Sequence, residues 1–445
     1  MTTLTNPLHS TSGAEYSSFP SGAIELRPTF SLECFHNPYL PEGGSEVNAI
    51  ITVGPRPSPQ RRAARSGGGE VIIVDVSGSM EGIKLNQARD ATIAAIDCIA
   101  DGVQFAVVAG NDRAMKVYPA TGLVPANSRT RSEARRRVRK LKARGGTAMG
   151  EWISLATRLF EPVGGFRHAI LLTDGKDEHE TPEALARALA AAAGLFQCDC
   201  RGVGTDWSVA ELRTVATSLL GAVDIVANPD DLTADFQEVM RRAMSRGVPD
   251  VRLRVWVPKD AEVVCLKQVA PELLVLAASP TRSDDRTRDY LTGAWGDESR
   301  DYHLMVRVPP ASRGDEMLAA RVAVVADGQE AARSLIRATW TDDRVLSTRV
   351  SREVAHYTGQ EQLADAIQEG LDALAAGDRE TAVVHLGRAV HLAASSGNTQ
   401  VGDLLGEVVD VEDAATGRIR LKPMVDLVDV MTLDTRSTRT ERVHK

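Results

Sequence analysis

Three oxygen-bearing side chains alternate directly after one apolar segment of this chain. Asp75, Ser77 and Ser79 follow the Val- and Ile-rich run at residues 71–74. A run of this kind without a polar break is typical of a strand covered on both faces in a parallel sheet, and such strands present ligands at their carboxyl ends. One carboxylate and two hydroxyls are hard donors that suit Mg²⁺, whereas zinc and copper prefer His or thiolate ligands. The pattern predicts a magnesium site, with Mn²⁺ or Ca²⁺ as alternatives.

Two later segments offer ligands of the same kind. Thr147 follows a glycine-rich turn and precedes a helical pattern that begins at Met149. Asp174 closes a second buried-type strand at residues 168–173 and is followed by Gly175. Because parallel strands gather their carboxyl ends at one edge of a sheet, we expect these side chains to join the first three. The simpler alternative is that Ser and Asp after strands only cap helices, and that Asp-Gly is an ordinary turn.

The Asp-x-Ser-x-Ser pattern of residues 75–79 resembles the metal-ion-dependent adhesion site (MIDAS) of the von Willebrand factor A (VWA) family. A Thr and an Asp from two later loops complete the site in that family. The resemblance therefore implies a metal site held by Asp75, Ser77, Ser79, Thr147 and Asp174.

The order of elements supports the same family. Strands alternate with helices of ten or more residues over 67–246, which predicts a doubly wound, Rossmann-like α/β fold with a mostly parallel sheet. The predicted strands are 71–74, 104–109, 115–118, 168–173, 196–203 and 222–226, and the predicted helices are 84–100, 132–143, 149–160, 182–193, 208–219 and 232–244. We interpret residues 67–246 as a VWA domain.

Strand patterns flank this domain on both sides. Residues 24–66 contain two alternating apolar segments and a linker, and residues 247–345 contain several more. All of them have the half-buried alternation of antiparallel strands. We therefore predict one antiparallel β-sandwich into which the VWA domain is inserted.

The two ends of the chain differ from this core. Residues 1–23 are rich in Ser, Thr, Gly and Pro and are expected to be disordered. Residues 346–423 are predicted to be helical, with a hairpin formed by helices at 361–376 and 381–395. Residues 424–445 are expected to be a flexible tail with threonines among arginines. Phosphorylation of this tail would suit a kinase or a phosphothreonine-binding partner, although an idle disordered end is the simpler interpretation.

Composition limits the classes of partner. The chain has 445 residues, 43% of them hydrophobic, and a formal net charge of −8, so its bulk charge does not favour nucleic acid or anionic membrane. No apolar run approaches the roughly twenty residues of a membrane span, and the first residues lack the pattern of a secretory signal. We therefore expect a cytoplasmic protein without nucleic-acid or membrane partners.

One segment departs from this acidic balance. Residues 135–142 carry six basic side chains and no acidic one. Such a run could bind an acidic partner or phosphates. A solvated helix face with Val138 and Leu141 turned inward is the interpretation we prefer from the sequence.

The resemblance also indicates a function. In the VWA family the ion seldom performs chemistry, because it keeps one coordination position open for an Asp or Glu of a partner protein. This implies a metal-dependent protein-interaction module, not an enzyme, in an intracellular signalling or assembly complex. Residues 75–79 are not a Gly-x-Ser-x-Gly hydrolase elbow, and the sequence has no nucleotide-binding P-loop motif. The alternative is a non-catalytic subunit of an ATP-driven chelatase or remodelling complex, since such complexes also use VWA domains.

Overall fold

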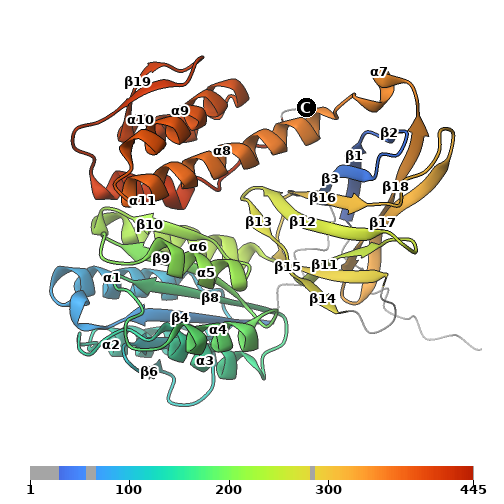
Figure 1. Cartoon of the computed structure of the whole chain (residues 1–445). Helices are drawn as coiled ribbons and strands as arrows, with labels where there is room; N and C mark the ends of the chain where they lie inside the picture. Colours follow the sequence, from blue (N-terminus) through green and yellow to red (C-terminus); the bar gives the residue numbers. More distant parts are fainter. Residues whose placement is uncertain (1–29, 57–66, 281–285, 444–445) are drawn as a thin grey trace, which may run out of the picture.

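The structure is a computed structural model that describes residues 30–56, 67–280 and 286–443 (Figure 1). The predicted disorder of residues 1–23 and most of the predicted linker lie outside the described residues. Three parts follow along the chain: a β-sandwich, an α/β domain of residues 68–245 inserted in it, and a C-terminal helical region.

The α/β domain is built on a mostly parallel sheet. Its strands lie in the order β10 (Val223–Val226), β9 (Gln197–Val203), β8 (Phe166–Thr173), β4 (Gly68–Asp75), β5 (Gln104–Gly110) and β6 (Ala114–Tyr118). β4 pairs in parallel with both β5 and β8, and only the edge strand β6 and the short β7 (Val124–Pro125) run antiparallel. All eight residues of β4 are buried, as its unbroken apolar run predicts.

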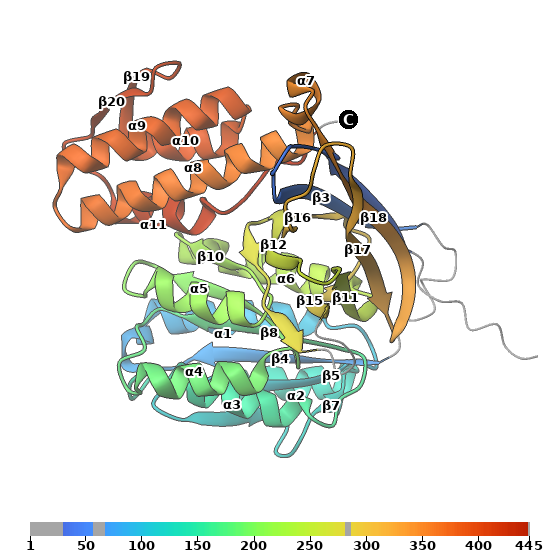
Figure 2. The same ribbon diagram turned by 45° about the vertical axis from the view of Figure 1, so that its right-hand side comes forward.

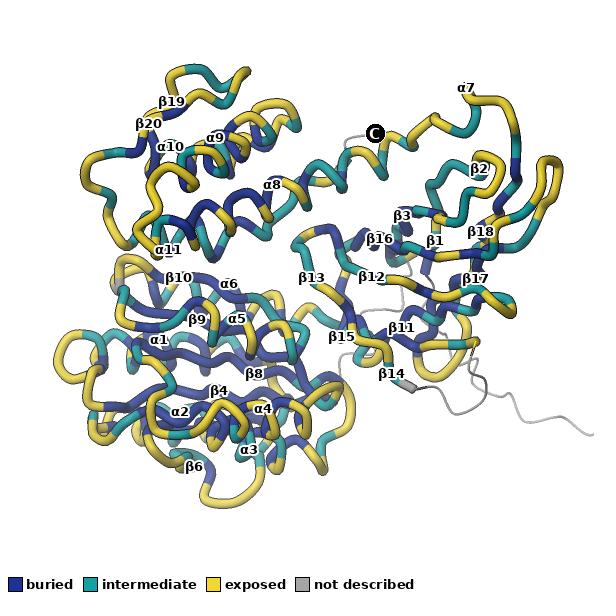
Figure 3. Tube along the Cα trace, in the orientation of Figure 1, coloured by how far each residue is buried: buried dark blue, intermediate teal, exposed yellow. Residues whose placement is uncertain are grey.

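Helices cover both faces of this sheet. Alternate residues of β4 enter two separate cores, with Val71 and Ile73 on one face and Ile72 and Val74 on the other. The first face is covered by α3 (Met149–Phe160), α4 (Pro182–Ala192) and α5 (Val209–Ser218), and the second by α1 (Ile83–Cys98), α2 (Ser128–Val138) and α6 (Leu232–Ser245). Figure 3 shows the strands buried between helices that expose their outer sides. The predicted doubly wound α/β fold is confirmed.

The β-sandwich combines strands from both sides of the inserted domain. One sheet has the order β1 (Phe30–His36), β3 (Glu46–Pro55), β16 (Arg300–Arg307), β12 (Glu262–Ala270) and β13 (Leu274–Val275). The other has the order β14 (Ala278–Pro280), β15 (Thr287–Trp295), β11 (Val248–Trp256), β17 (Glu316–Ala326), β18 (Gln329–Thr341) and β2 (Tyr39–Pro41). Because β3 pairs with β16, the chain leaves this sheet, forms the α/β domain and returns.

The sandwich strands predicted at residues 251–257, 302–308, 318–325 and 332–339 are present, and their pairings with one another and with β3, β12 and β15 are antiparallel. The sequence did not predict the short β2, which pairs in parallel with β18. β12 and β15 were also missing from the predicted strands, and the pairing of β12 with β16 shows why β12 was missed. A register shift between Val263 and Cys265 inserts a bulge, so buried Val263, Leu266 and Val269 are spaced by three residues and hide the period of two.

The C-terminal region is helical only in part. The predicted hairpin corresponds to α8 (Arg352–Ala375) and α9 (Arg379–Ser396), followed by α10 (Thr399–Val408). Residues 409–421, predicted as helix, instead form the β-hairpin of β19 (Val409–Asp413) and β20 (Arg418–Leu421). Its two strands alternate apolar with charged residues, and Arg420 pairs with Glu412 at 2.7 Å. In the part of the chain that is described, no helix is long and apolar enough to cross a membrane.

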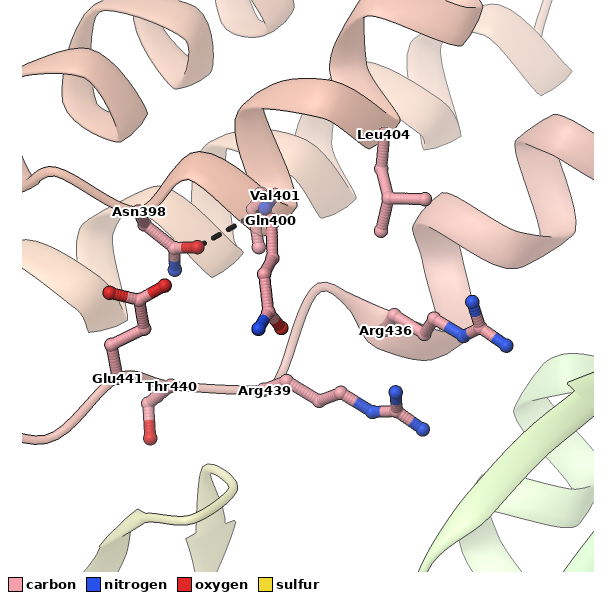
Figure 4. A pocket seen from close by; sticks show the side chains of 8 residues that line it. All are labelled: Asn398, Gln400, Val401, Leu404, Arg436, Arg439, Thr440 and Glu441. Carbon is pink, nitrogen blue, oxygen red and sulfur yellow. Dashed lines mark hydrogen bonds between the residues drawn. The ribbon is translucent and has the colours of Figure 1, made fainter.

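The predicted flexible tail, residues 424–445, has a defined structure over the residues that are described, 424–443. It forms α11 (Leu427–Arg436), which lies beside β10 in both ribbon views (Figures 1 and 2), and then a strap along the sandwich. Arg436 and Arg439 point to the same side (Figure 4), and both bind the carboxylate of Asp224 in β10. Arg442 donates to Asp301 in β16 at 2.7 and 2.9 Å. The tail is ordered because its arginines find acidic partners far away in the sequence.

A charged triad lies near the amino ends of three parallel strands, on the side of the sheet that contacts the sandwich. His168 in β8 lies between Glu70 in β4, at 2.9 Å, and Asp199 in β9, at 3.0 Å. All three are buried. Burial alone would lower the pKa of His168, but the charge of Glu70 and the hydrogen bonds with Asp199 and Glu70 raise this pKa to about 9. The imidazolium therefore joins the three strands at neutral pH.

The triad predicts a pH-dependent stability. A histidine whose pKa rises from 6.5 to about 9 on folding stabilises the fold fully below pH 6.5, and this contribution is lost as the pH rises through about 9. We expect the free energy of unfolding to fall in that interval by up to about 1.4 kcal/mol per pH unit. His168→Gln should remove the slope in urea denaturation, whereas the exposed-site control His391→Gln should keep it. Equal slopes in wild type and His168→Gln would contradict this assignment.

Candidate metal centre

The first segment of the site is the turn after β4. Asp75 is the last residue of β4, and its Oδ1 accepts a hydrogen bond from Ser77 N at 2.7 Å. The chain then forms the short helix η2 (Gly78–Met80), which brings the Ser77 and Ser79 hydroxyls to 3.0 Å from each other. Met80 is fully buried and anchors the turn. Alternate positions after the strand thus present a carboxylate and two hydroxyls together.

The second segment is the loop that carries Thr147. Two backbone hydrogen bonds attach it to the first segment: Arg144 N donates to Val76 O at 2.7 Å, and Gly78 N donates to Gly145 O at 2.9 Å. Thr147 itself is buried and precedes α3. The loop that carries Thr147 is therefore attached to the turn that carries the two serines.

The third segment is the end of β8. Asp174 is fully buried, and its Oδ1 accepts a hydrogen bond from Ser79 Oγ at 2.7 Å. The hydroxyl of the preceding Thr173 donates a hydrogen bond to Asp75 Oδ2. These two bonds join the ends of β4 and β8, which are adjacent in the sheet.

The open space of the site lies in front of Gly175. A Cβ atom at this glycine would lie 3.0 Å from Thr147 Oγ1, 3.6 Å from Ser79 Oγ and 4.0 Å from Asp75 Oδ2. Oxygen atoms from the first two segments therefore line a small volume beside the glycine of the third segment, and a side chain at this glycine would fill it. The structure brings together all five side chains that the sequence singled out.

The two buried carboxylates are only partly neutralised. Burial raises the pKa of Asp75 to about 6, and the charge of Asp174 adds to this rise against hydrogen bonds from Thr173 and Ser77. One cation lies close by: Lys84 Nζ, from the first turn of α1, is 2.6 Å from Asp174 Oδ2 and 3.2 Å from Asp206. Although burial opposes it, the bond to Asp174 raises the pKa of Lys84. The ammonium of Lys84 thus neutralises part of the negative charge at Asp174.

Two of these residues were not assigned from the sequence. Thr173 belongs to the strand end that resembled the family, but its hydroxyl could be assigned to Asp75 only once the strand order was known. Lys84 was predicted simply as the first residue of a helix. The only signal for its role was its place one turn after the Ser-x-Ser segment, at a helix start beside the carboxyl edge.

The donor set fits a hard divalent cation. Within the described ranges, no group of three or more His, Cys, Asp or Glu side chains is placed to hold a metal ion, so an ion at this edge depends on the Ser and Thr hydroxyls. All five candidate side chains offer oxygen, which suits Mg²⁺, Mn²⁺ or Ca²⁺ better than a softer metal. Ser79 is exposed whereas the other four are buried, so the site opens to solvent on that side.

One flank of the site is strongly acidic. Asp177 and Glu180 accept hydrogen bonds from the first amides of α3, Asp177 from Met149 N at 3.2 Å. Glu211 accepts a hydrogen bond from Asp177 N at 2.9 Å. Burial and the neighbouring Glu180 raise the pKa of Asp177 to about 8. Acidic side chains are therefore crowded on the side of the site formed by residues 177–180, and the raised pKa keeps Asp177 largely protonated at neutral pH.

Two family models match this chain. The von Willebrand factor type A domain matches residues 70–225, which include the whole candidate site. The von Willebrand factor type A C-terminal domain matches residues 391–437, which run from the end of α9 to the end of α11.

Solved structures and curated proteins agree with these matches. A von Willebrand factor type A structure from Catenulispora acidiphila is 46% identical and covers 96% of this chain and 99% of that chain, with a TM-score of 0.89. The ArnB paralog VWA2 from Sulfolobus acidocaldarius shares the fold at 16% identity, over 92% of this chain and 98% of that chain, with a TM-score of 0.57. The uncharacterized protein sll0103 of Synechocystis sp. is 27% identical over 46% of this chain, which spans about half of that protein's length. The chain belongs to the von Willebrand factor type A family.

Proposed function

We propose that this protein is a metal-dependent interaction module that binds an acidic side chain of a partner protein through Mg²⁺. The VWA family is in general a family of protein-interaction modules. The observation that carries the proposal is the convergence of oxygen atoms of Asp75, Ser79 and Thr147 on the space in front of Gly175, where Ser79 is also hydrogen-bonded to Asp174. Mn²⁺ and Ca²⁺ are alternative ions with the same ligand chemistry.

The residues of the site have distinct roles in this proposal. Ser77, Ser79 and Thr147 would hold the ion through their hydroxyls, and Asp75 and Asp174 would supply the negative charge that retains it. When bound, the ion supplies an open coordination position for a carboxylate, which forms a strong charge-assisted contact in a partly dry site. The exposed side at Ser79 is where a partner would approach.

We propose a binding role without catalysis. Ser77 and Ser79 hydrogen-bond to each other, Ser79 donates to Asp174, and among the described residues no histidine forms a hydrogen bond with either hydroxyl. A serine nucleophile needs such a base within hydrogen-bond reach. We place the module in an intracellular signalling or assembly complex, and a subunit of an ATP-driven chelatase or remodelling complex stays the alternative prediction.

Asp75→Asn tests the proposal while keeping the size of the side chain. Because the variant removes one of two carboxylates, Mg²⁺ affinity measured by titration calorimetry should fall by more than about tenfold. Partners captured from lysate with Mg²⁺ should be lost in EDTA and with Asp75→Asn. The matched control is Asp90→Asn, an exposed acid on α1 that should leave both readouts unchanged. Identical partners in all samples would reject the proposal.

Lys84 generates a prediction of the opposite sign. Its ammonium occupies Asp174 Oδ2 and repels a second cation, so Lys84→Met should tighten Mg²⁺ binding by about tenfold. Lys176→Met removes an exposed lysine two residues from Asp174 and serves as the charge-matched control. Weaker Mg²⁺ binding by Lys84→Met, with an unchanged melting temperature, would show instead that Lys84 supports the ion-binding arrangement.

A further inference from the structure

Five cations form an exposed run on one flank of the candidate metal centre. Arg137, Arg139, Lys140, Lys142 and Arg144, here called the basic run, are all exposed, and none forms a salt bridge with any residue that the structure describes. The sequence between residues 137 and 144 contains no acidic side chain. Although the whole chain has a net charge of −8, this segment is positively charged and would attract a negatively charged ligand.

The basic run is not needed to attach its own segment to the domain. Arg135 of α2 pairs with Asp97 of α1 at 2.9 Å, and Arg131 pairs with Asp101. Val138, which the sequence predicted to face inward, is fully buried in the core that α1, α2 and α6 cover. Since α2 is held by these contacts, the five cations of the basic run are left available for a ligand.

The run leads directly into the metal centre. Its last residue, Arg144, donates from its backbone N to Val76 O at 2.7 Å, and the next residue accepts from Gly78 N. Thr147 follows three residues after Arg144. The basic run therefore begins at the rim of the site and extends away from it along the end of α2.

Acidic residues also border the site, in the segment of residues 177–180, where His179 N donates to Thr147 O at 3.0 Å. Asp177, Glu178 and Glu180 lie in this segment, and Glu211 accepts a hydrogen bond from Asp177 N. The glutamates would repel an acidic ligand, and the basic run would attract it. The charge of the rim thus favours a bound acidic chain that runs along the basic run.

We infer that the carboxylate that binds the metal lies within an acidic stretch of the partner protein, and that the neighbouring Asp or Glu side chains bind the basic run. This inference rests on the proposed function, because it names the partner chemistry for the same site. Short-range attraction to several exposed cations favours an extended segment with successive acids over a folded surface with one carboxylate.

Three fluorescein-labelled peptides of equal length test the inference by anisotropy. Each has one Asp. In the first, Glu residues precede the Asp and Gln residues follow it; in the second this order is reversed; in the third both flanks are Gln. With Mg²⁺ at low ionic strength, at least one Glu-containing peptide should bind about tenfold tighter than the Gln peptide, and high salt should remove the difference. Equal affinities of all three peptides would overturn the inference.

A variant with four substitutions tests whether the basic run causes the preference for the Glu peptide. Arg137, Arg139, Lys140 and Lys142, all replaced by Gln, should reduce binding of the Glu peptide to that of the Gln peptide. The control replaces Arg158, Lys259, Arg349 and Arg388 by Gln, four exposed residues elsewhere, and loses the same net charge. Undiminished discrimination by the first variant, or equal loss in both, would refute a role for the basic run.

Two further arms separate this inference from the proposed function. If the Glu peptide keeps its advantage in EDTA and with Asp75→Asn, the basic run binds acidic peptide but the metal-dependent function fails. If both peptide types need Mg²⁺ and bind equally, the function stands and this inference fails. A single-stranded oligouridine of equal charge is the competitor for a nucleic-acid site, and its displacement of the Glu peptide at equal concentration would overturn the acidic-peptide assignment.

Discussion

The burial of two like charges side by side is the constraint on which this structure depends. Asp75 and Asp174 end neighbouring parallel strands and are both fully buried, and the pKa of Asp75 rises to about 6 as a result. Hydroxyl donors from Thr173 and Ser79 and the ammonium of Lys84 offset only part of the repulsion. A divalent cation would complete the compensation. The loops converge at this edge because β4 and β8 are neighbouring parallel strands, and the convergence leaves two carboxylates whose charge is only partly compensated.

At the amino ends of the parallel strands of the same sheet, buried charges are compensated by partners within the chain. His168 lies between Glu70 and Asp199, and Asp224 forms ion pairs with Arg436 of α11 and Arg439 of the C-terminal strap. Each of these acids has a basic partner within the chain. This edge contacts the sandwich, since Ala294 N in β15 donates to Gln197 at 2.9 Å. Charges that are paired internally join the three parts, whereas the partly compensated edge, where Ser79 is exposed, is where we propose that a partner binds.

The sequence predicted what depends on local patterns. Apolar runs that close on Asp75 and Asp174 specify buried parallel strands, and parallel strands bring their ends together, so both the doubly wound fold and the five converging side chains followed. Contacts across long separations were not predictable. The tail is ordered by Arg436 and Arg439 on Asp224, more than two hundred residues away, and Lys84 reaches two loops whose positions depend on strand order. Local irregularity also hid β12, whose bulge breaks the period of two.

The central claim is that these three segments form one metal centre, and the anomalous scattering of a crystal soaked in Mn²⁺ tests it most directly. The account predicts a single strong anomalous peak in front of Gly175, within ligand distance of the hydroxyl oxygens of Ser77, Ser79 and Thr147. Crystals of Asp75→Asn treated in the same way should lack it. A well-ordered wild-type crystal with no peak there, or with the peak on the acidic flank at residues 177–180, would contradict the account.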